Sequence, residues 1–368
     1  MIPEPVNICP EYKQILFNKK AFKTIDFISI VFFVAVAAAK QPEFHKLQKQ
    51  KGKVFLFMMT YTEFQNAVLE RIKIIKGRNC EVTIREVPKN NGIRLMGISI
   101  MEKGSDICPT IYLESFYDAY KKGEELPAVV QDICEIYRQN MIIGTVNFEF
   151  FLDYGRVKNR IFLKMINYEE NREMLANVPH QRFLDLAVVC YYAYMNDLMG
   201  KGSIQIDKDL LCKWKISEEE LFFDAEKNTR NILGMELKDM HELLFGMLLQ
   251  KWNPTTPEEV KLIEDEVYGL TSEVPMYIMT LRGGSFGAVC MSVSEWMEQF
   301  GRECGGSFFI LPSSIHELIL IPENSGETAG NLQEMVCEVN ASCVSAEEKL
   351  SDSVYYYNSQ KKAVELVS

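Results

Sequence analysis

The chain has 368 residues, more than one ordinary hydrophobic core accommodates, which predicts two or three domains. Its composition, 47% hydrophobic and 25% charged, is that of a globular protein and excludes a disordered or collagen-like chain. The net charge of −11 disfavours binding to the phosphates of nucleic acids, and no basic cluster in residues 58–368 offsets it.

Residues 1–57 differ from the rest of the chain, because nine lysines against four acidic residues give this segment a net charge of +5. The apolar run from Phe27 to Ala39 is shorter than the roughly 20 residues that a membrane-spanning helix needs. It resembles the core of a signal peptide, which ends in small residues. A signal or anchor is therefore one hypothesis for this segment.

Residues 1–57 are also consistent with a misassigned start of translation or with a cytosolic extension. The misassigned start is favoured, because Met58 and Met59 directly precede a capping-box pattern from Thr60 to Glu63, as at the beginning of a domain. For residues 58–368 we expect a cytoplasmic location and no membrane association.

Beyond residue 57, short strands and helices follow one another without a repeat of fixed period. This pattern predicts an α+β fold with mixed sheets and two to three subdomains. The expected segments are an atypical basic extension at 1–57, a hairpin-and-helix α+β domain at 58–145, a middle α+β region at 146–250, an acidic linker at 251–274 and a C-terminal α+β module at 275–368.

Two stretches give the clearest strand signals. Residues 82–87 and 93–100 flank a turn in which Asn91 and Gly92 tolerate positive φ, so they predict a hairpin. Residues 183–194 are apolar almost throughout and predict a central strand.

A glycine-rich loop carries the first motif that could indicate chemistry. Gly283, Ser285 and Gly287 fit the G-x-S-x-G pattern of a nucleophile elbow, which requires a helix directly after the second glycine. Residues 288–293 are instead typical of a strand, so a loop between two antiparallel strands is the favoured interpretation.

The segment 307–322, SFFILPSSIHELILIP, contains two short apolar runs that predict buried strands on either side of a turn. Its polar residues could supply a nucleophile, a base and an orienting acid: Ser313, Ser314, His316 and Glu317. Neighbouring residues of a strand point to opposite faces, so Glu317 is poorly placed to orient His316. A structural turn is therefore favoured over a catalytic site.

His180 is the other candidate base, because it follows a proline in an expected loop beside a buried strand, although a capping role is favoured. His241 lacks the second histidine of a H-E-x-x-H metal site, since Phe245 stands there. The ten cysteines include no pair two residues apart, and no glycine pattern for phosphate or dinucleotide binding occurs. We therefore expect reduced thiols, no metal site and no cofactor.

Six stretches together are similar to one family: REVPKNNGIRLMGISI, PTIYLESFYDAY, FFLDYGRVKNRIFLKMINYEEN, VPHQRFLDLAVVCYY, FILPSSIHELILIP and LSDSVYYY. From about Met58 to Val354 the chain resembles a bacterial family of unknown function, the domain of unknown function numbered 5688. Residues 185–229 and the C-terminal strands resemble more distantly the uncharacterised family numbered 1444. Neither resemblance implies a reaction, a ligand or site residues.

These observations predict a non-catalytic module that binds a protein partner or a small ligand, since no candidate catalytic group is accompanied by the partner that it needs. The alternative is a hydrolase or transferase in which His316 or His180 is the general base, aided by Ser313 or Ser314.

Overall fold

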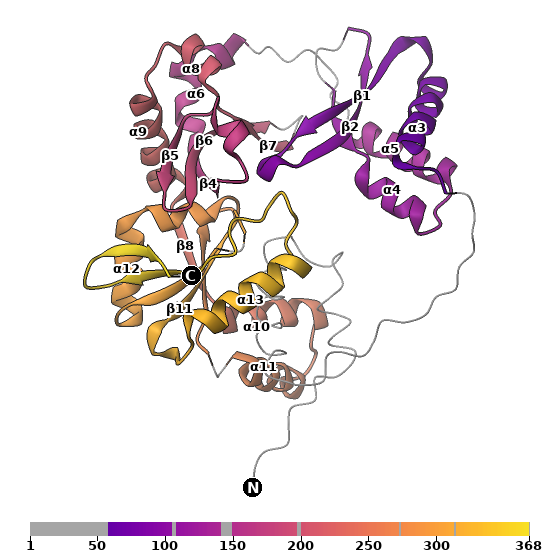
Figure 1. The fold of residues 1–368 in the computed structure, drawn as a ribbon. Coiled ribbons are helices and arrows are strands. Elements are labelled where there is room, and N and C mark those ends of the chain that lie inside the picture. The colour runs from indigo at the N-terminus through magenta and orange to yellow at the C-terminus, as the bar shows by residue number, and fades with distance from the viewer. Residues whose placement is uncertain are drawn as a thin grey trace. The chain divides into compact units, whose positions relative to one another are not determined.

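The computed structural model describes residues 58–104, 108–140, 149–196, 200–271, 274–312 and 314–367. These residues form two compact units: a small unit of residues 58–160 and 192–204, and a large unit of residues 161–191 and 205–367 (Figure 1). The expected middle segment at 146–250 is thus divided between the two units. The hypotheses on residues 1–57 lie outside the described residues.

The small unit consists of helices and one three-stranded antiparallel sheet in the order β1-β2-β3. Its elements are α3 (Tyr61–Lys76), η2 (Gly77–Asn79), β1 (Cys80–Pro88), η3 (Asn90–Gly92), β2 (Arg94–Glu102), β3 (Thr110–Tyr112), α4 (Glu114–Lys121), α5 (Leu126–Asn140), η4 (Glu149–Leu152), α6 (Tyr154–Val157) and η5 (Lys158–Arg160).

The predicted hairpin is confirmed. Val82 pairs with Ile100 and Ile84 with Ile98, so apolar residues of both strands share the face that packs into the core of the small unit. Asn91 adopts a φ of 58°, the left-handed conformation that its place in the turn requires.

Helix α3 begins with the predicted capping box. The Thr60 hydroxyl accepts from the Glu63 backbone N–H, and the Glu63 carboxylate accepts from the Thr60 backbone N–H. Phe64, Val68 and Ile72 follow at helical spacing and are fully buried in the core of the small unit.

A second sheet contains β4 (Ile161–Asn167), β5 (His180–Phe183), β6 (Leu186–Asn196) and β7 (Gly200–Gln205), with β6 between β4 and β5 and also paired with β7. The strand predicted over 183–194 therefore begins later, at Leu186. Leu184, with a φ of 54°, and Asp185 form the tight turn between β5 and β6.

Strand β4 lies at the edge of this sheet, and side chains close its outer edge. The Asn228 side-chain amide donates to the Ile161 carbonyl at 2.9 Å, and the Thr229 hydroxyl accepts from the Leu163 N–H at 2.9 Å. Asn228 ends helix α9 (Glu218–Asn228), and Thr229 begins the π-helical turn η6 (Thr229–Leu233). The Ile161 carbonyl and the Leu163 N–H are thus satisfied without a further strand.

The third sheet has six strands, all antiparallel, in the order β13-β12-β10-β11-β9-β8. The remaining elements of the large unit are α7 (Arg172–Leu175), α8 (Lys208–Trp214), β8 (Met235–Asp239), α10 (Met240–Trp252), α11 (Pro257–Thr271), β9 (Tyr277–Leu281), η7 (Gly287–Ser292), α12 (Ser294–Cys304), β10 (Phe308–Leu311), β11 (Leu318–Pro322), η8 (Glu323–Ser325), α13 (Ala329–Ser342), β12 (Tyr355–Asn358) and β13 (Ala363–Leu366).

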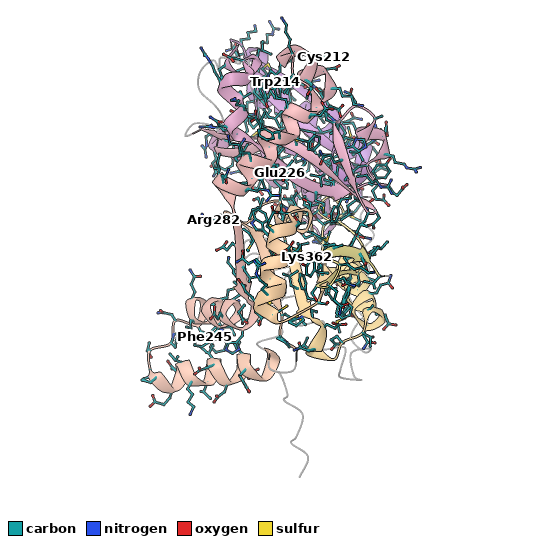
Figure 2. The ribbon with its side chains drawn as sticks, turned by 90° about the vertical axis from the view of Figure 1, so that its left-hand side faces the viewer. Cys212, Trp214, Glu226, Phe245, Arg282 and Lys362 are labelled. Carbon is teal, nitrogen blue, oxygen red and sulfur yellow. The ribbon has the colours of Figure 1, made fainter. Side chains whose placement is uncertain are left out.

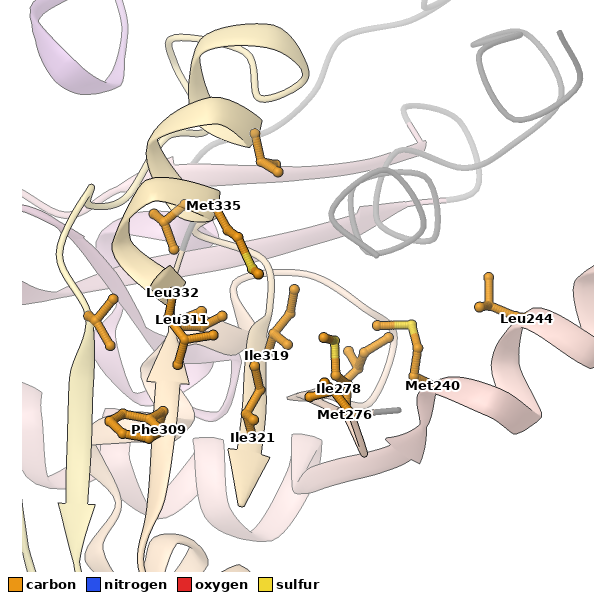
Figure 3. Packing of buried hydrophobic residues seen from close by; sticks show 14 of the residues in the cluster. Met240, Leu244, Met276, Ile278, Phe309, Leu311, Ile319, Ile321, Leu332 and Met335 are labelled. Atoms are coloured by element: carbon orange, nitrogen blue, oxygen red, sulfur yellow. The ribbon is translucent and has the colours of Figure 1, made fainter. Parts of the chain in front are cut away.

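Both faces of the six-stranded sheet are covered. Leu332 and Met335 of α13 lie over Leu311 and Ile319 on one face (Figure 3). On the other face, Phe300 of α12 packs against Phe308 and Tyr277 with ring centroids 4.7 and 5.2 Å apart. The two strands predicted within residues 307–322 are therefore confirmed as a hairpin at the centre of a three-layer arrangement.

Two segments contain helices that the sequence did not predict. Residues 251–274, expected to be a linker, contain α11, which packs beside α10 as a helical pair (Figure 2). Residues 288–293, expected to be a strand, form the 3₁₀ helix η7 instead. The strand prediction for residues 288–293 was wrong because short apolar runs do not distinguish a strand from a buried helical turn.

The α+β fold class with several mixed helical and sheet regions is confirmed. Within the described ranges, no helix combines the length and the apolar character that crossing a bilayer requires.

Candidate functional site

The polar residues predicted as a site lie in the turn between β10 and β11, and Ser313 lies outside the described residues. His316 and Glu317 precede β11, which begins at Leu318, so strand alternation does not decide their directions. Ser314 is fully buried and Glu317 is 2% exposed. The turn therefore places two of its polar residues inside the protein.

Both ring nitrogens of His316 have partners. Nδ1 accepts from the backbone N–H of Phe286 at 3.3 Å, and Nε2 lies 3.5 Å from Oε1 of Glu348. Nδ1 therefore carries no proton, and the Nε2 proton faces the carboxylate. The hydrogen bond from His316 lowers the pKa of Glu348, whose other oxygen accepts from the Ser345 hydroxyl at 2.9 Å.

The glycine-rich loop of the G-x-S-x-G motif wraps around the His316 backbone. The carbonyl of His316 accepts from the Gly287 N–H and from the Thr280 hydroxyl, each at 2.8 Å. A Cβ atom on Gly287 would lie 2.3 Å from Thr280 Oγ1 and 2.6 Å from the His316 oxygen. Glycine is needed at this position because the two segments approach so closely.

The structure gives the loop the strand–turn–helix order of a nucleophile elbow, since η7 starts directly at Gly287. However, the exposed Ser285 makes no hydrogen bond to His316 among the described residues. The left-handed conformation belongs to Phe286, with a φ of 60°, and not to the serine. In this structure the motif therefore forms a contact between the loop before η7 and the β10–β11 turn.

Ser314 interacts with the backbone and not with the imidazole. Its hydroxyl accepts from the His316 N–H at 3.0 Å, a local turn contact. Its backbone forms an isolated bridge with Lys349, and the Ile315 N–H donates to the Glu348 carbonyl at 2.9 Å. Residues 345–351 thus fix the turn that carries His316.

His180 lies at the start of β5, in a separate environment. Its Nδ1 is 2.9 Å from the carbonyl oxygen of Val178, and its ring centroid is 5.9 Å from that of Tyr168. No contact among the described residues joins His180 to His316 or Ser314. The structure therefore does not bring the two predicted histidines together.

Sequence reasoning missed Lys164, which lies on β4 beside the His316 turn. Its Nζ atom is 5.4 Å from the centroid of the Phe286 ring, and that ring stacks on His316 with centroids 5.5 Å apart. Burial lowers the pKa of Lys164 to about 8, because the charged ammonium is poorly solvated. A single lysine inside the apolar run IFLKMI was the available signal.

Tyr191 of β6 completes this group. Its ring meets Phe286 edge to face, with centroids 4.7 Å apart, and it is 5% exposed. Burial raises the pKa of its hydroxyl, so the phenol stays protonated at neutral pH. We call Lys164, Tyr191, Phe286, His316 and Glu348 the Phe286 cluster.

A second feature that sequence reasoning missed is the carboxylate of Asp185, which accepts hydrogen bonds from three hydroxyl groups. Asp185 accepts from Tyr355 at 2.5 Å, from Ser351 at 3.2 Å and from Ser353 at 3.3 Å. These bonds join the β5–β6 turn to the first residue of β12 and to the segment before it. This network of hydrogen bonds connects segments far apart in sequence and stabilises the fold of the large unit.

The described residues contain no group of three or more histidine, cysteine, aspartate or glutamate side chains that could hold a metal ion. The nine described cysteines are free thiols. Burial raises the pKa of Cys190 and Cys290, which makes these two thiols poor nucleophiles.

The chain is thus an α+β protein in which an amine, an imidazole–carboxylate pair and two aromatic rings meet in one unit. The family model described as "Family of unknown function (DUF5688)" matches residues 61–359, and the chain belongs to this family. The more distant similarity to the family numbered 1444 is not shown by this match. No curated protein and no solved structure matches the chain significantly.

Proposed function

We propose that residues 58–368 act as a non-catalytic binding module in the cytoplasm. The observation that carries the proposal is the state of His316, whose two ring nitrogens are occupied by the Phe286 N–H and by Glu348. A general base needs a free nitrogen within reach of the proton that it removes. The free thiols of the described cysteines support a reducing compartment.

The burial of Ser314 supports the same proposal. Its hydroxyl is inaccessible to a substrate and is already used by the turn. Ser314 is therefore not presented to a substrate in the arrangement that acyl or phosphoryl transfer requires, and both ring nitrogens of His316 are occupied.

The test uses a fluorophosphonate probe, which labels activated serine nucleophiles covalently. We expect no label on the full chain after prolonged incubation, whereas a known serine hydrolase treated in parallel is labelled completely. Peptide mapping would place any label at Ser285, Ser313 or Ser314. A stoichiometric label that disappears in His316→Gln would contradict the proposal and identify a hydrolase.

One observation favours the catalytic alternative at the other histidine. The Nδ1 atom of His180 faces the Val178 carbonyl, and Nε2 makes no hydrogen bond among the described residues. His180→Gln serves as the second variant in the labelling experiment, and a label lost only in this variant would favour a hydrolase or transferase with His180 as its base.

A further inference from the structure

Two hydrogen-bond donors of the Phe286 cluster have no acceptor among the described residues. Among the described residues, Lys164 Nζ has neither a carboxylate partner nor a hydrogen bond, and its contact is the Phe286 ring. The Tyr191 hydroxyl likewise makes no hydrogen bond there. Lys164 is partly buried, and withdrawing an ammonium from water without a counter-charge costs free energy, so a purely structural role accounts poorly for this arrangement.

The position of Lys164 within β4 also argues against a purely structural role. Phe162 and Lys164 are two residues apart and share one face of the strand. The Phe162 ring lies 6.0 Å from that of Tyr191, centroid to centroid, so this face carries aromatic groups around a single cation. A purely structural role would be met better by an apolar residue, like the neighbours Leu163 and Met165.

The aromatic ring at the centre is held in a fixed position. Phe286 adopts the left-handed conformation, which is rare for a bulky residue and is maintained only where the surroundings impose it. Here its own N–H is bound by His316 Nδ1, and the next residue, Gly287, is bound by the His316 carbonyl. The imidazole–carboxylate pair thus positions the ring that faces Lys164 and Tyr191.

We propose that Lys164, Tyr191 and Phe286 form a recognition site for a small aromatic ligand that carries a carboxylate or a phosphate group. The anionic group pairs with the Lys164 ammonium and accepts from the Tyr191 hydroxyl, and the ligand ring packs on Phe286. His316 and Glu348 are positioning residues, because they hold Phe286 and do not contact the ligand.

This inference rests on the proposed function, whose ligand class it specifies. It also accounts for the missing counter-charge of Lys164, because the ligand supplies that charge when it binds. A surface lysine of the same unit behaves differently, since Lys361 pairs with Glu365 at 2.7 Å in an exposed position.

The experiment is a ligand-observed NMR titration of the full chain with two pairs of probes. Benzoate and phenyl phosphate are the anionic probes, and benzamide and benzyl alcohol are their neutral counterparts. We expect at least one anionic probe to bind ten-fold or more tightly than its neutral counterpart. The stronger of the two anions identifies carboxylate or phosphate as the preferred group.

Three variants assign the effect to the site. Lys164→Met should abolish the preference for the anion, while the neutral probes keep their affinity. Tyr191→Phe, which keeps the ring and removes only the hydroxyl, should weaken the anion two- to five-fold. Lys361→Met, the matched control, should leave every affinity unchanged.

Equal affinity for the charged and neutral probes, or a preference that survives in Lys164→Met, would overturn the inference. The same spectra record whether a probe is consumed. An anion preference that depends on Lys164 together with hydrolysis of phenyl phosphate would support the site and contradict the non-catalytic function, so the two failures are distinguishable.

Discussion

The two units of the protein are built from contacts of different range. In the small unit, the Tyr120 hydroxyl accepts from the Met59 N–H, 61 residues apart, and the Tyr61 hydroxyl donates to Glu114, 53 residues apart. In the large unit, hydrogen bonds join segments much farther apart in sequence. Asp185 and Tyr355 are 170 residues apart, and Asn167 and Leu350 are 183 residues apart. Contacts between residues so distant form slowly in folding, because a long loop must close first.

This difference indicates which unit can form a ligand-binding site. The Phe286 cluster takes its members from β4, β6, the loop before η7, the β10–β11 turn and the segment after α13. Only the unit that assembles distant segments brings such groups together. The bonds of the small unit span shorter separations in sequence, and the variants below test whether the two units respond separately.

The largest effect is expected in the central hairpin of the large unit. Leu318→Ala and Ile319→Ala each remove a fully buried side chain, and they do so on opposite faces of β11. Each should lower the free energy of unfolding by about 2–5 kcal/mol. Hydrogen exchange followed by mass spectrometry should show faster exchange in β9, β10 and β12 and unchanged protection in α3.

Ile98→Ala is the matched control, because this residue is fully buried in the small unit. It should increase exchange in α3 and β1 and leave β10 unchanged. If either variant loosened both units equally, the separation into two units would be wrong.

A somewhat smaller effect is expected at the contact between the two loops. Gly287→Ala forces a methyl group to within 2.3 Å of Thr280 Oγ1, so a segment must shift and the bond to the His316 carbonyl is weakened. We expect a loss of about 1–3 kcal/mol in urea denaturation. Gly306→Ala is the control, since nothing lies within 4 Å of its added carbon; an equal loss there would refute the argument.

Lys164→Met should raise the free energy of unfolding, whereas the variants above lower it. Because the pKa of Lys164 falls from 10.5 to about 8 on folding, its ammonium destabilises the folded state fully below pH 8. The penalty decreases as the pH rises through 8 and has vanished above 10.5, where the lysine is neutral in both states. The variant should gain about 1–2 kcal/mol at pH 7. Urea denaturation at pH 7 and pH 10 measures this gain, and a gain that did not shrink at pH 10 would contradict the assigned pKa.

The smallest effect is expected at the start of the small unit. Thr60→Ala removes the side-chain oxygen that accepts the Glu63 N–H and should cost about 1 kcal/mol. The loss should appear as faster exchange in α3 alone, since the capping box is local. Thr60→Ser, which keeps the oxygen, should restore protection; loss of protection in the large unit as well would be unexpected.

Elements encoded by local patterns were predictable from the sequence. The α3 capping box, the Asn91–Gly92 turn and the two strands around the PSS turn each depend on residues close together in the chain. The prediction for residues 288–293 was wrong because burial on all sides removes the periodicity that separates a strand from a helical turn. The helix α11 within the predicted linker at 251–274 was not recognised, because most of its residues are exposed and few are apolar at helical spacing.

The candidate site could be predicted only in part. His316 was identified from its strand-flanked position, but its partner Glu348 lies 32 residues further on and in no motif. Lys164 and Tyr191 meet Phe286 only because β4 and β6 are neighbours in one sheet that packs near η7. Such neighbourhoods are set by tertiary structure, which a single sequence does not reveal.

The closed edge of β4 has a consequence for how copies of this protein behave in concentrated solution. An edge strand with free N–H and C=O groups is a template on which another chain can extend a sheet. At Ile161 and Leu163 those groups are bound by Asn228 and Thr229. Intermolecular strand addition at these two residues therefore requires the end of α9 and the start of η6 to detach first, which disfavours aggregation through this part of the edge.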